Sequence, residues 1–277
     1  MTPKIMNALT EDQWQQYERD GYLKLGRLLS DSELAALQQR IDDIMMGRSK
    51  VDYDQMVMQL DGGGDDYSKI LPQTRGFKGP SRNYRKIEDL ELDPLFLEFS
   101  KHPLARHICG RVYGTQTAIK CMRAMFMNKP ARRGTVLPWH QDHWTGLDPD
   151  PLVTIWTALD PSTSDNGCMR IIPASHRKLV NPDDPAGFLS KEQLAALDES
   201  TAIHLESAAG ESVLLHNWLL HSSDVNDSSQ SRRAYSVCYM EATTKCCEVE
   251  ALQAYQFNVL FGEGELTPET LSSRAPA

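Results

Sequence analysis

The residues best suited to chemistry in this chain are two histidines and one carboxylate. His140 and Asp142 are two positions apart, and residues at this spacing on an extended strand point to the same face. His221 lies 79 positions beyond Asp142 (221 − 142), as expected when two separate strands meet in space. Two histidines and a carboxylate on one side of a metal leave coordination positions open, which suits a non-haem Fe(II) that must bind a co-substrate and O2. His140 and Asp142 are therefore candidate metal ligands, and His221 is a candidate for the third.

Three other histidines are interpreted as structural. His143 alternates to the opposite strand face from Asp142, and His216 precedes His221 by five positions in the same strand and turn. His176 belongs to neither segment. A His-x-Asp pair alone is weak evidence, because a packed histidine and a turn aspartate give the same pattern by chance. The rest of the chain must therefore support the metal site.

The composition is that of a globular chain. It has 277 residues, 40% of them hydrophobic, and a formal net charge of -9, so we expect neither nucleic acid nor an anionic membrane as partner. No apolar run approaches the roughly 18 residues of a membrane-spanning helix, and the first residues lack the apolar core of a signal peptide. We expect a cytoplasmic protein acting on a small molecule. Six cysteines without a C-x-x-C pair favour reduced thiols over a zinc site or disulfides, and the oligomeric state stays open.

Helices are expected first along the chain and strands after them. Capping-box patterns begin helices after Thr10 and Ser30, and a helical stretch is expected over 94–113. Runs rich in β-branched and aromatic residues predict strands, including 118–127, 152–159, 212–216 and 234–240. This order predicts a single domain, mainly β with flanking helices. Its parts are a helical N-terminal part (about 1–115), a β core (about 116–245) and an insertion (about 181–208).

Three local patterns add further expectations. Asp165-Asn166-Gly167 favours a type I′ hairpin turn, with Cys168 to Ile172 as the returning strand. The stretch from Val51 to Pro80 lacks a periodic pattern and is expected to form a long loop, either a lid over a binding site or a plain surface loop. Within the insertion, Ser190 is expected to cap a short helix.

With these positions identified, the chain resembles the phytanoyl-CoA dioxygenase family of Fe(II)/2-oxoglutarate oxygenases over most of its length. The matching segments share order and spacing with that family and are Asp20–Leu23, Lys86–Asp89, Met127–Pro130, Trp139–Asp142, Trp156–Ala158, Asp165–Cys168, Ile172–His176 and His221–Asn226, followed by Arg232. The resemblance implies a double-stranded β-helix core of the jelly-roll or cupin type. Two antiparallel sheets would face each other, with the iron at one mouth and His140, Asp142 and His221 as its ligands.

The resemblance also implies which residues hold 2-oxoglutarate. The family places an arginine eleven residues after the distal histidine, which is Arg232, and a hydroxyl at Ser223. A guanidinium can bind the far carboxylate through two parallel hydrogen bonds, which a lysine cannot reproduce. Arg233 must face the other way on a strand and fits a surface salt bridge. Three more residues align with 2-oxoglutarate contacts of the family, and they are Lys86, Met125 and Trp156. The alternative is that Lys86 is a surface lysine and that Met125 and Trp156 are ordinary core residues.

The activity implied is oxidative decarboxylation of 2-oxoglutarate to succinate and CO2, coupled to hydroxylation of an unactivated C–H bond of a small-molecule metabolite by O2. Related halogenases have a small residue in place of Asp142, so the carboxylate here favours oxygenation. Family members act on acyl-CoA thioesters, amino acids, phosphonates and secondary metabolites, and the fold does not choose among them. The candidate substrate-pocket residues are Arg82, Tyr84, Arg85, Trp139 and Trp144. The two arginines could bind an anionic substrate, but they could equally belong to a solvated basic surface.

Two other functions could use the same metal ligands. Zn2+ also accepts two histidines and a carboxylate, so a non-catalytic or hydrolytic metal-binding β-barrel is one alternative. Arg232 with Ser223 distinguishes the two, because a zinc protein has no reason to place them beside the metal. The second alternative is an inactive binding homologue, which release of succinate from 2-oxoglutarate would argue against.

Overall fold

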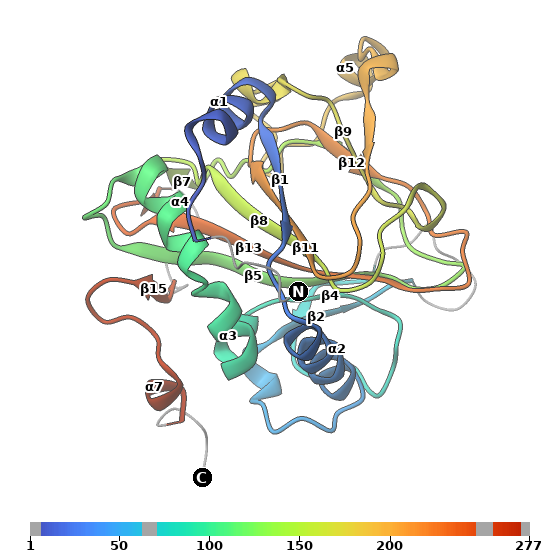
Figure 1. Cartoon of the computed structure of the whole chain (residues 1–277). Coiled ribbons are helices and arrows are strands. Elements are labelled where there is room, and N and C mark those ends of the chain that lie inside the picture. Colours follow the sequence, from blue (N-terminus) through green and yellow to red (C-terminus); the bar gives the residue numbers. More distant parts are fainter. Residues whose placement is uncertain (1–6, 63–70, 248–256, 273–277) are drawn as a thin grey trace.

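Two antiparallel β-sheets form the centre of the molecule (Figure 1). The computed structural model describes residues 7–62, 71–247 and 257–272. The nine-stranded large sheet runs in the order β1 (Tyr22–Arg27), β11 (Glu211–His216), β8 (Val153–Ala158), β13 (Arg232–Glu241), β5 (Ile119–Lys129), β4 (Tyr84–Ile87), β2 (Val57–Leu60) and β3 (Thr74–Arg75), with β15 (Val259–Phe261) paired to β5. The small sheet runs β10 (Ile203–Leu205), β9 (Met169–Ile171), β12 (His221–Ser223) and β6 (Leu137–His140). A separate pair is β14 (Lys245–Cys246) with β7 (Leu147–Asp148).

Side-chain alternation on the large sheet explains why one face meets the small sheet and the other meets helices. Trp156 and Ala158 on β8 belong to a core that also contains Met169 and Ile171 of the small sheet. Ile155, one position earlier on β8, belongs instead to the larger outer core. Successive residues on a strand point to opposite faces, so a sheet covered on both sides needs apolar residues at both sets of positions. The inner core therefore lies between the two sheets.

Helices cover the outer face of the large sheet. Helices α2 (Asp31–Met45), α3 (Pro94–Ser100) and α4 (Pro103–Tyr113) supply Ile41, Phe96 and Ile108 to the outer core. Helices α1 (Glu11–Asp20) and α2 begin with the predicted capping boxes, at Thr10 and Ser30, where side chains satisfy backbone N–H groups that a helix start leaves unpaired. The remaining short elements are η1 (Tyr53–Gln55), η2 (Leu90–Leu92), η3 (Ser164–Asn166), η4 (Ser175–Arg177), α5 (Lys191–Ala195), η5 (Glu199–Thr201) and α7 (Pro268–Ser272).

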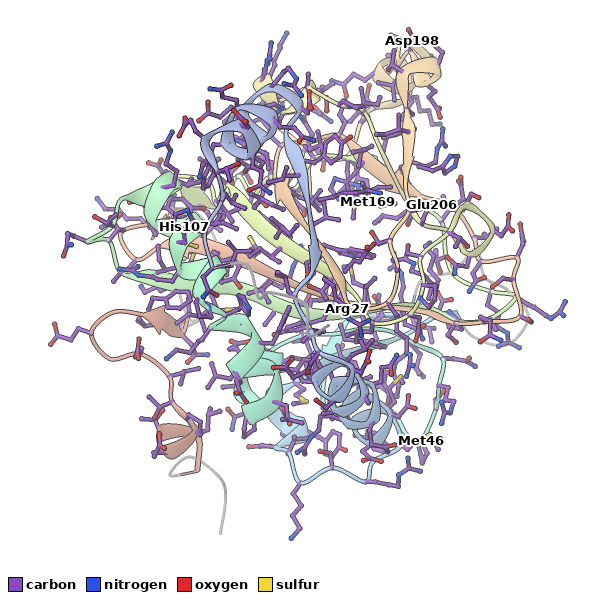
Figure 2. All side chains as sticks on the ribbon, viewed as in Figure 1. Arg27, Met46, His107, Met169, Asp198 and Glu206 are labelled. Atoms are coloured by element: carbon purple, nitrogen blue, oxygen red, sulfur yellow. The ribbon has the colours of Figure 1, made fainter. Side chains whose placement is uncertain are left out.

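This arrangement confirms the predicted fold class, a mainly β protein with flanking helices and a double-stranded β-helix core. Side chains fill the space between the sheets and under the helices (Figure 2). The N-terminal part, over about 1–115, also contributes strands β1 to β4 to the large sheet. In the part of the chain that the structure describes, no helix is both long and apolar enough to cross a bilayer.

The hairpin predicted at Asp165-Asn166-Gly167 is wrong. Strand β8 lies in the large sheet and β9 in the small one, so the chain crosses between sheets here. The connection contains the short helix η3, in which the Asn166 side chain accepts a hydrogen bond from the Thr163 N–H at 2.8 Å, and Gly167 has a φ of 73°. Both a helix end and a type I′ turn need the left-handed conformation that Asn-Gly favours. The dipeptide alone therefore does not distinguish a helix end from a hairpin turn.

The prediction of one long loop from Val51 to Pro80 is corrected in part. The described residues of this stretch include η1, β2 and β3, and Met58 on β2 is fully buried. Burial along β2 does not alternate, so the strand lacks the two-residue pattern by which strands are recognised in a sequence. Residues 63–70, with most of the Gly- and Asp-rich run, lie outside the described residues, so the choice between a lid and a surface loop stays open.

The insertion contributes the edge strand β10 to the small sheet and reaches the predicted metal site at Phe188. Ser190 caps α5 through a capping box, as predicted, and Figure 2 shows Asp198 at the outer tip of this segment. The chain returns as β10, which pairs with β9. Near the start of the insertion, Phe188 forms an isolated backbone bridge with His140.

Candidate active site

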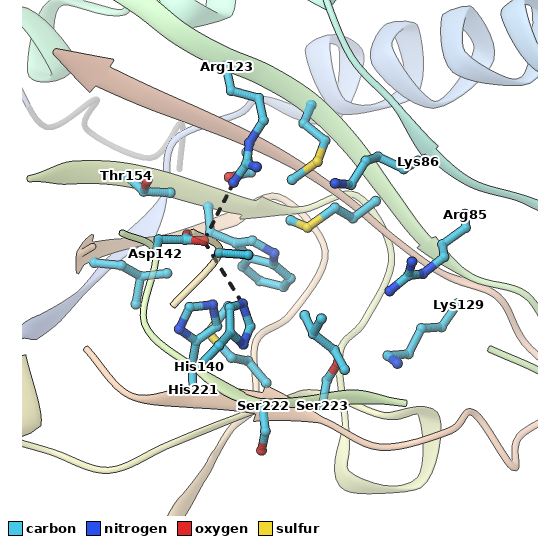
Figure 3. Close-up of a pocket in the computed structure, with 18 of the residues that line it drawn as sticks. Arg85, Lys86, Arg123, Lys129, His140, Asp142, Thr154, His221, Ser222 and Ser223 are labelled. Carbon is cyan, nitrogen blue, oxygen red and sulfur yellow. Dashed lines mark ion pairs between the residues drawn. The ribbon is translucent and has the colours of Figure 1, made fainter. Parts of the chain in front are cut away.

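Strand pairing in the small sheet brings the predicted metal ligands together (Figure 3). His140 on β6 and His221 on β12 are direct cross-strand partners, and their ring centroids are 4.1 Å apart. Asp142 follows β6, and its Oδ1 lies 3.9 Å from His140 Nε2. One ligand atom from each of the three residues lies within 4.8 Å of the others. This spacing allows a single metal ion to bind all three.

Backbone carbonyls orient the two histidine rings. His140 Nδ1 lies 2.8 Å from the carbonyl oxygen of Pro138, and His221 Nδ1 lies 2.9 Å from that of Leu219. Because a carbonyl oxygen can only accept, each Nδ1 carries the hydrogen and donates it. This leaves Nε2 of each ring free to bind a metal, as is common at metal sites. Burial, together with the neighbouring His221, lowers the pKa of His140 to about 3, which keeps this ring neutral at physiological pH.

Asp142 is held in its ionised form by cationic and imidazole neighbours. Burial by itself would raise the pKa of Asp142, but Arg123 and then the two histidines outweigh burial, and the pKa lies below its ordinary value. Arg123 Nη2 lies 3.6 Å from Asp142 Oδ1. The backbone N–H of Asp142 donates to the carbonyl oxygen of Asn217 at 2.8 Å. The carboxylate is therefore charged and fixed in place by the protein itself.

Gln141, between the two ligands on the chain, ties three segments together around the site. Its Nε2 donates to the carbonyl oxygens of Lys178 at 2.8 Å and Trp218 at 2.6 Å, and its Oε1 accepts from the N–H of Val180 at 2.7 Å. These bonds connect the ligand segment with the residues just before the insertion and with the turn before His221. Gln141 is buried and, by strand alternation, faces away from the metal ligands. It is therefore a positioning residue that sequence patterns did not single out.

Arg232 and Trp156 present buried hydrogen-bond donors to the same pocket. Arg232 is 5% exposed, and its Nη2 donates to the carbonyl oxygen of Gly167 at 3.0 Å. Within the described residues, neither Arg232 Nε nor Trp156 Nε1 has a hydrogen-bond partner. Burial lowers the pKa of Arg232 to about 10, so the guanidinium stays charged at neutral pH. Because an unsatisfied buried donor costs about 1–3 kcal/mol, these groups fit an anionic ligand such as the far carboxylate of 2-oxoglutarate.

The other residues predicted to hold 2-oxoglutarate line the same pocket, whose cavity volume is about 220 Å³. Ser223 is buried on β12, and Figure 3 shows it between the metal ligands and the far end of the pocket. Met125 on β5 contributes to the apolar wall. Lys86 on β4 forms an ion pair with Glu88 at 3.3 Å, and burial followed by repulsion from Arg123 lowers the pKa of Lys86. The metal ligands and all five of these predicted residues therefore share one cavity.

Two further cations, Arg123 and Lys129, line the pocket but were not predicted. Arg123 lies on the same face of β5 as Met125, Met127 and Lys129, which also line the pocket, because alternate residues of a strand share a face. Lys129 is the register partner of Arg232, and burial, followed by repulsion from Arg232, lowers the pKa of Lys129 to about 7. The two-residue period of a strand, counted from the predicted pocket residue Met125, would have indicated both Arg123 and Lys129.

Trp139 and Tyr84, predicted as substrate-pocket residues, lie outside the lining of the pocket. Trp139 faces away because its strand neighbour His140 faces the metal site, and it packs in a separate small core. Tyr84 is buried in the outer core, where its hydroxyl donates to the carbonyl oxygen of Gly79 at 2.9 Å. Trp144, the third predicted aromatic residue, does line the pocket.

Arg82, predicted as a substrate contact, also lies outside the pocket. Its side chain is exposed, and Nη1 lies 3.2 Å from Asp42 Oδ2. Arg85, three positions later, lines the pocket. Arg233 points away from the pocket, as interpreted, and pairs with Asp160 at 2.7 Å.

The remaining histidines have structural partners. His143 lines the pocket together with Asp142, so its predicted position on the opposite face is wrong, because β6 ends at His140. Its Nδ1 lies 2.5 Å from Asp150 Oδ2. His216 Nδ1 accepts a hydrogen bond from the Trp218 N–H at 3.1 Å, and its ring lies 5.0 Å from that of His176. Among residues 7–62, 71–247 and 257–272, the only cluster of His, Cys, Asp and Glu side chains close enough to share a metal is the predicted one.

Comparisons with known proteins agree with this site. The family model described as Phytanoyl-CoA dioxygenase (PhyH) matches residues 17–234. A "Probable phytanoyl-CoA dioxygenase" of Caenorhabditis elegans is 28% identical over 245 residues, which span 84% of this chain and 76% of that protein.

Solved structures share the fold at low sequence identity. The non-heme alpha-ketoglutarate-dependent carbocyclase SnoK from nogalamycin biosynthesis superposes with a TM-score of 0.68 at 18% identity, covering 95% of this chain and 98% of that one. EctD from S. alaskensis, in a structure with 2-oxoglutarate and 5-hydroxyectoine, superposes with a TM-score of 0.65 at 20% identity, covering 86% of this chain and 78% of that one. Both similarities support the two-sheet fold described above.

Proposed function

The chain belongs to the phytanoyl-CoA dioxygenase family, and from this membership we propose that it uses Fe(II) and 2-oxoglutarate to hydroxylate an unactivated C–H bond of a small-molecule metabolite. One observation carries the proposal. Three side chains able to share a metal lie in the same pocket as the buried donors of Arg232 and Trp156, which have no acceptor among the described residues. A metal ion would bind the three ligand side chains, and a dicarboxylate would accept hydrogen bonds from Arg232 and Trp156.

The three ligands would hold Fe(II) through Nε2 of His140, Nε2 of His221 and a carboxylate oxygen of Asp142. When bound, iron and 2-oxoglutarate supply the oxidation, in which one oxygen atom of O2 enters the substrate and the other enters succinate as CO2 leaves. The protein contributes the geometry. All three ligands come from adjoining segments of the small sheet, so the opposite side stays open toward the pocket for small molecules.

Arg232 would bind the far carboxylate of 2-oxoglutarate, with Trp156 and Ser223 as additional donors. A guanidinium matches the planar geometry of a carboxylate and stays charged even when buried. Met125 also lines the pocket and would contact the carbon chain of the co-substrate. EctD, a protein of the same fold, binds 2-oxoglutarate together with a hydroxylated compound, which supports both the co-substrate and the type of product.

Zinc could occupy the same three ligands, as in a metal-binding β-barrel without oxygenase activity. The buried donors of Arg232 and Trp156 argue against this function, because a zinc site gives no reason to leave a charged donor unsatisfied inside the protein. An inactive binding homologue would keep both features but would not turn over 2-oxoglutarate.

An anaerobic reconstitution separates these functions. The protein is mixed with Fe(II) and 2-oxoglutarate, the visible spectrum is recorded, and succinate is measured after air is admitted. We expect a weak charge-transfer band and slow succinate release without any primary substrate. Asp142→Ala should abolish both, and Arg82→Gln, at an exposed arginine outside the pocket, should leave both unchanged. A colourless mixture that yields no succinate would reject the oxygenase. A substrate panel with product mass should then show the gain of one oxygen atom.

A further inference from the structure

The pocket holds more positive charge than the proposed metal and co-substrate can balance. Five basic side chains line it together with the single carboxylate of Asp142, and these five are Arg85, Lys86, Arg123, Arg232 and Lys129, whose pKa burial lowers to about 7. Fe(II) adds two positive charges and 2-oxoglutarate adds two negative ones, so loading with both leaves the balance unchanged. Lys86 is compensated by Glu88. Because buried charge without a partner is costly, we expect a further anion in the pocket.

The cations divide into two groups by position. Figure 3 shows Arg85 and Lys129 on the far side of the pocket from the metal ligands, and Arg123 directly beside Asp142. Lys129 pairs in register with Arg232, so this far group surrounds the end that receives the co-substrate carboxylate. The buried carboxylate of Asp61 also acts on both Arg85 and Lys129. Arg123 is therefore the cation that remains available next to the metal.

Within the described residues, the Arg123 guanidinium has more hydrogen-bond donors than partners. Its Nη2 lies 3.6 Å from Asp142 Oδ1, and its Cζ lies 5.3 Å from the ring centroid of Trp144. Within the described residues, Asp142 is the one acidic side chain that forms an ion pair with it. A guanidinium carries five N–H donors, so several remain for another acceptor. Two parallel N–H groups are the geometry that binds a carboxylate most strongly.

Apolar rings surround the same side of the metal site. Phe188, from the insertion, stacks on His140 with ring centroids 5.0 Å apart and an interplanar angle of 28°. Trp144 lies beneath Arg123, and both aromatic residues line the pocket. The cavity of about 220 Å³ must also hold 2-oxoglutarate, and small-molecule sites are typically about 300–1,000 Å³. Only a small ligand, or a small part of a larger one, fits beside the metal.

We propose that Arg123 binds a carboxylate of the primary substrate next to the metal. This inference rests on the proposed function and gives its substrate class: small carboxylates with an apolar portion, held between Arg123, Trp144 and Phe188. Arg123 then determines specificity, because it selects the charged end of the substrate and thereby sets which C–H bonds face the metal. Lysine at this position would keep the charge but lose the second parallel hydrogen bond.

The test compares a charged probe with its neutral analogue. Hexanoate and hexanol are titrated by calorimetry into protein saturated anaerobically with Fe(II) and 2-oxoglutarate, so that Arg232 is already occupied. We expect hexanoate to bind wild-type protein at least about tenfold more tightly than hexanol, since hydrogen bonds to charged groups contribute about 1.5–3 kcal/mol. Arg123→Gln should weaken hexanoate about tenfold to a hundredfold and leave hexanol unchanged. The hexanoate affinity of Arg123→Lys should fall between those of wild type and Arg123→Gln, and that of Arg82→Gln should equal the wild-type affinity.

Failure of this inference is distinguishable from failure of the proposed function. The charge-transfer band and succinate release report on iron and 2-oxoglutarate. Because Arg123 also pairs with the metal ligand Asp142, both signals are recorded for every variant, and probe affinities are compared at Fe(II) and 2-oxoglutarate concentrations that saturate each variant. Arg123→Lys, which keeps the positive charge beside Asp142, separates loss of the probe from loss of the metal. If wild-type protein gives neither signal, the proposed function itself is rejected. If both signals are present but hexanoate binds no better than hexanol, or equally well to Arg123→Gln, the assignment of Arg123 is overturned.

Discussion

His140 and His221, far apart in the chain, are direct partners across the pairing of β6 with β12, with ring centroids 4.1 Å apart. The metal site is therefore built by sheet register, and Asp142 joins it from the residues just after β6. A slip of one residue in this pairing would turn one histidine to the other face of the sheet. Groups that fix the register are for this reason as important to metal binding as the ligands.

Gln141→Leu should weaken metal binding without removing a ligand. The change deletes three hydrogen bonds that connect the ligand segment to Lys178, Val180 and Trp218. Loss of groups that orient ligands typically costs about 10- to 100-fold in metal affinity. A Co(II) absorption titration measures the change, with Gln15→Leu on the exposed side of α1 as the control. Equal affinity in Gln141→Leu and wild type would contradict a positioning role.

Trp156→Phe should raise the KM for 2-oxoglutarate. The substitution keeps the aromatic ring but removes the buried indole N–H, which has no partner among the described residues. Loss of one hydrogen bond to a charged acceptor costs about 1.5–3 kcal/mol, or roughly 10- to 150-fold. The KM is measured from succinate release, with Trp14→Phe, in the helix-covered core, as the matched control. An unchanged KM would remove Trp156 from the co-substrate site.

Gly187→Ala should detach the insertion from the metal-binding segment. A Cβ at Gly187 would lie 1.9 Å from the carbonyl oxygen of Gln141, and the residue has a φ of +70°. Gly26, with a φ of +73° and no atom within 4 Å of its Cβ position, supplies a control with the same backbone strain. We expect Gly187→Ala to lower the thermal midpoint clearly more than Gly26→Ala, because only the first adds a clash. Equal midpoints would show that the insertion adjusts freely.

Glu91→Gln should reduce the dependence of stability on pH. Burial, reinforced by the nearby Asp89 carboxyl, raises the pKa of Glu91 to about 7. The folded state therefore binds this proton more tightly than the unfolded state, whose glutamate has a pKa of about 4.3. The stabilisation is fully present below about pH 4 and is lost as the pH rises through about 7.

Urea unfolding at about pH 5 and about pH 8 measures this effect. Wild type should lose unfolding free energy between the two, and Glu91→Gln should lose less, by an amount on the order of 1–3 kcal/mol. Glutamine keeps the acceptor that Asn258 bonds at 3.0 Å. Glu98→Gln, on the exposed side of α3, is the control. If Glu91→Gln and wild type lose the same stability, the Glu91 carboxyl does not titrate in this range.

Patterns that depend on short stretches of chain were predictable from sequence. The capping boxes at Thr10 and Ser30 need only four residues each, and the metal pair at His140 and Asp142 follows from the two-residue period of a strand. His221 required the family resemblance, since no local rule connects residues 79 positions apart. The fold class came from the same resemblance and from the order of helices and strands.

Features that depend on strand pairing were not predictable. Tyr84 and Trp139 were assigned to the pocket by residue type, but each lies on the other face of its strand, which only the sheet register decides. Arg123, by contrast, lies two positions before Met125 on the same face of β5, so the strand period could have predicted it. Asn166 and Gly167 end a short helix at a crossing between sheets, a choice set by the surrounding fold.

The most direct test is diffraction from crystals grown anaerobically with Fe(II) and 2-oxoglutarate, measured at the iron absorption edge. We predict one anomalous peak within bonding distance of His140 Nε2, His221 Nε2 and the Asp142 carboxylate, with a carboxylate of 2-oxoglutarate on Arg232. A peak elsewhere, or density for 2-oxoglutarate that leaves Arg232 without an anion, would contradict this account.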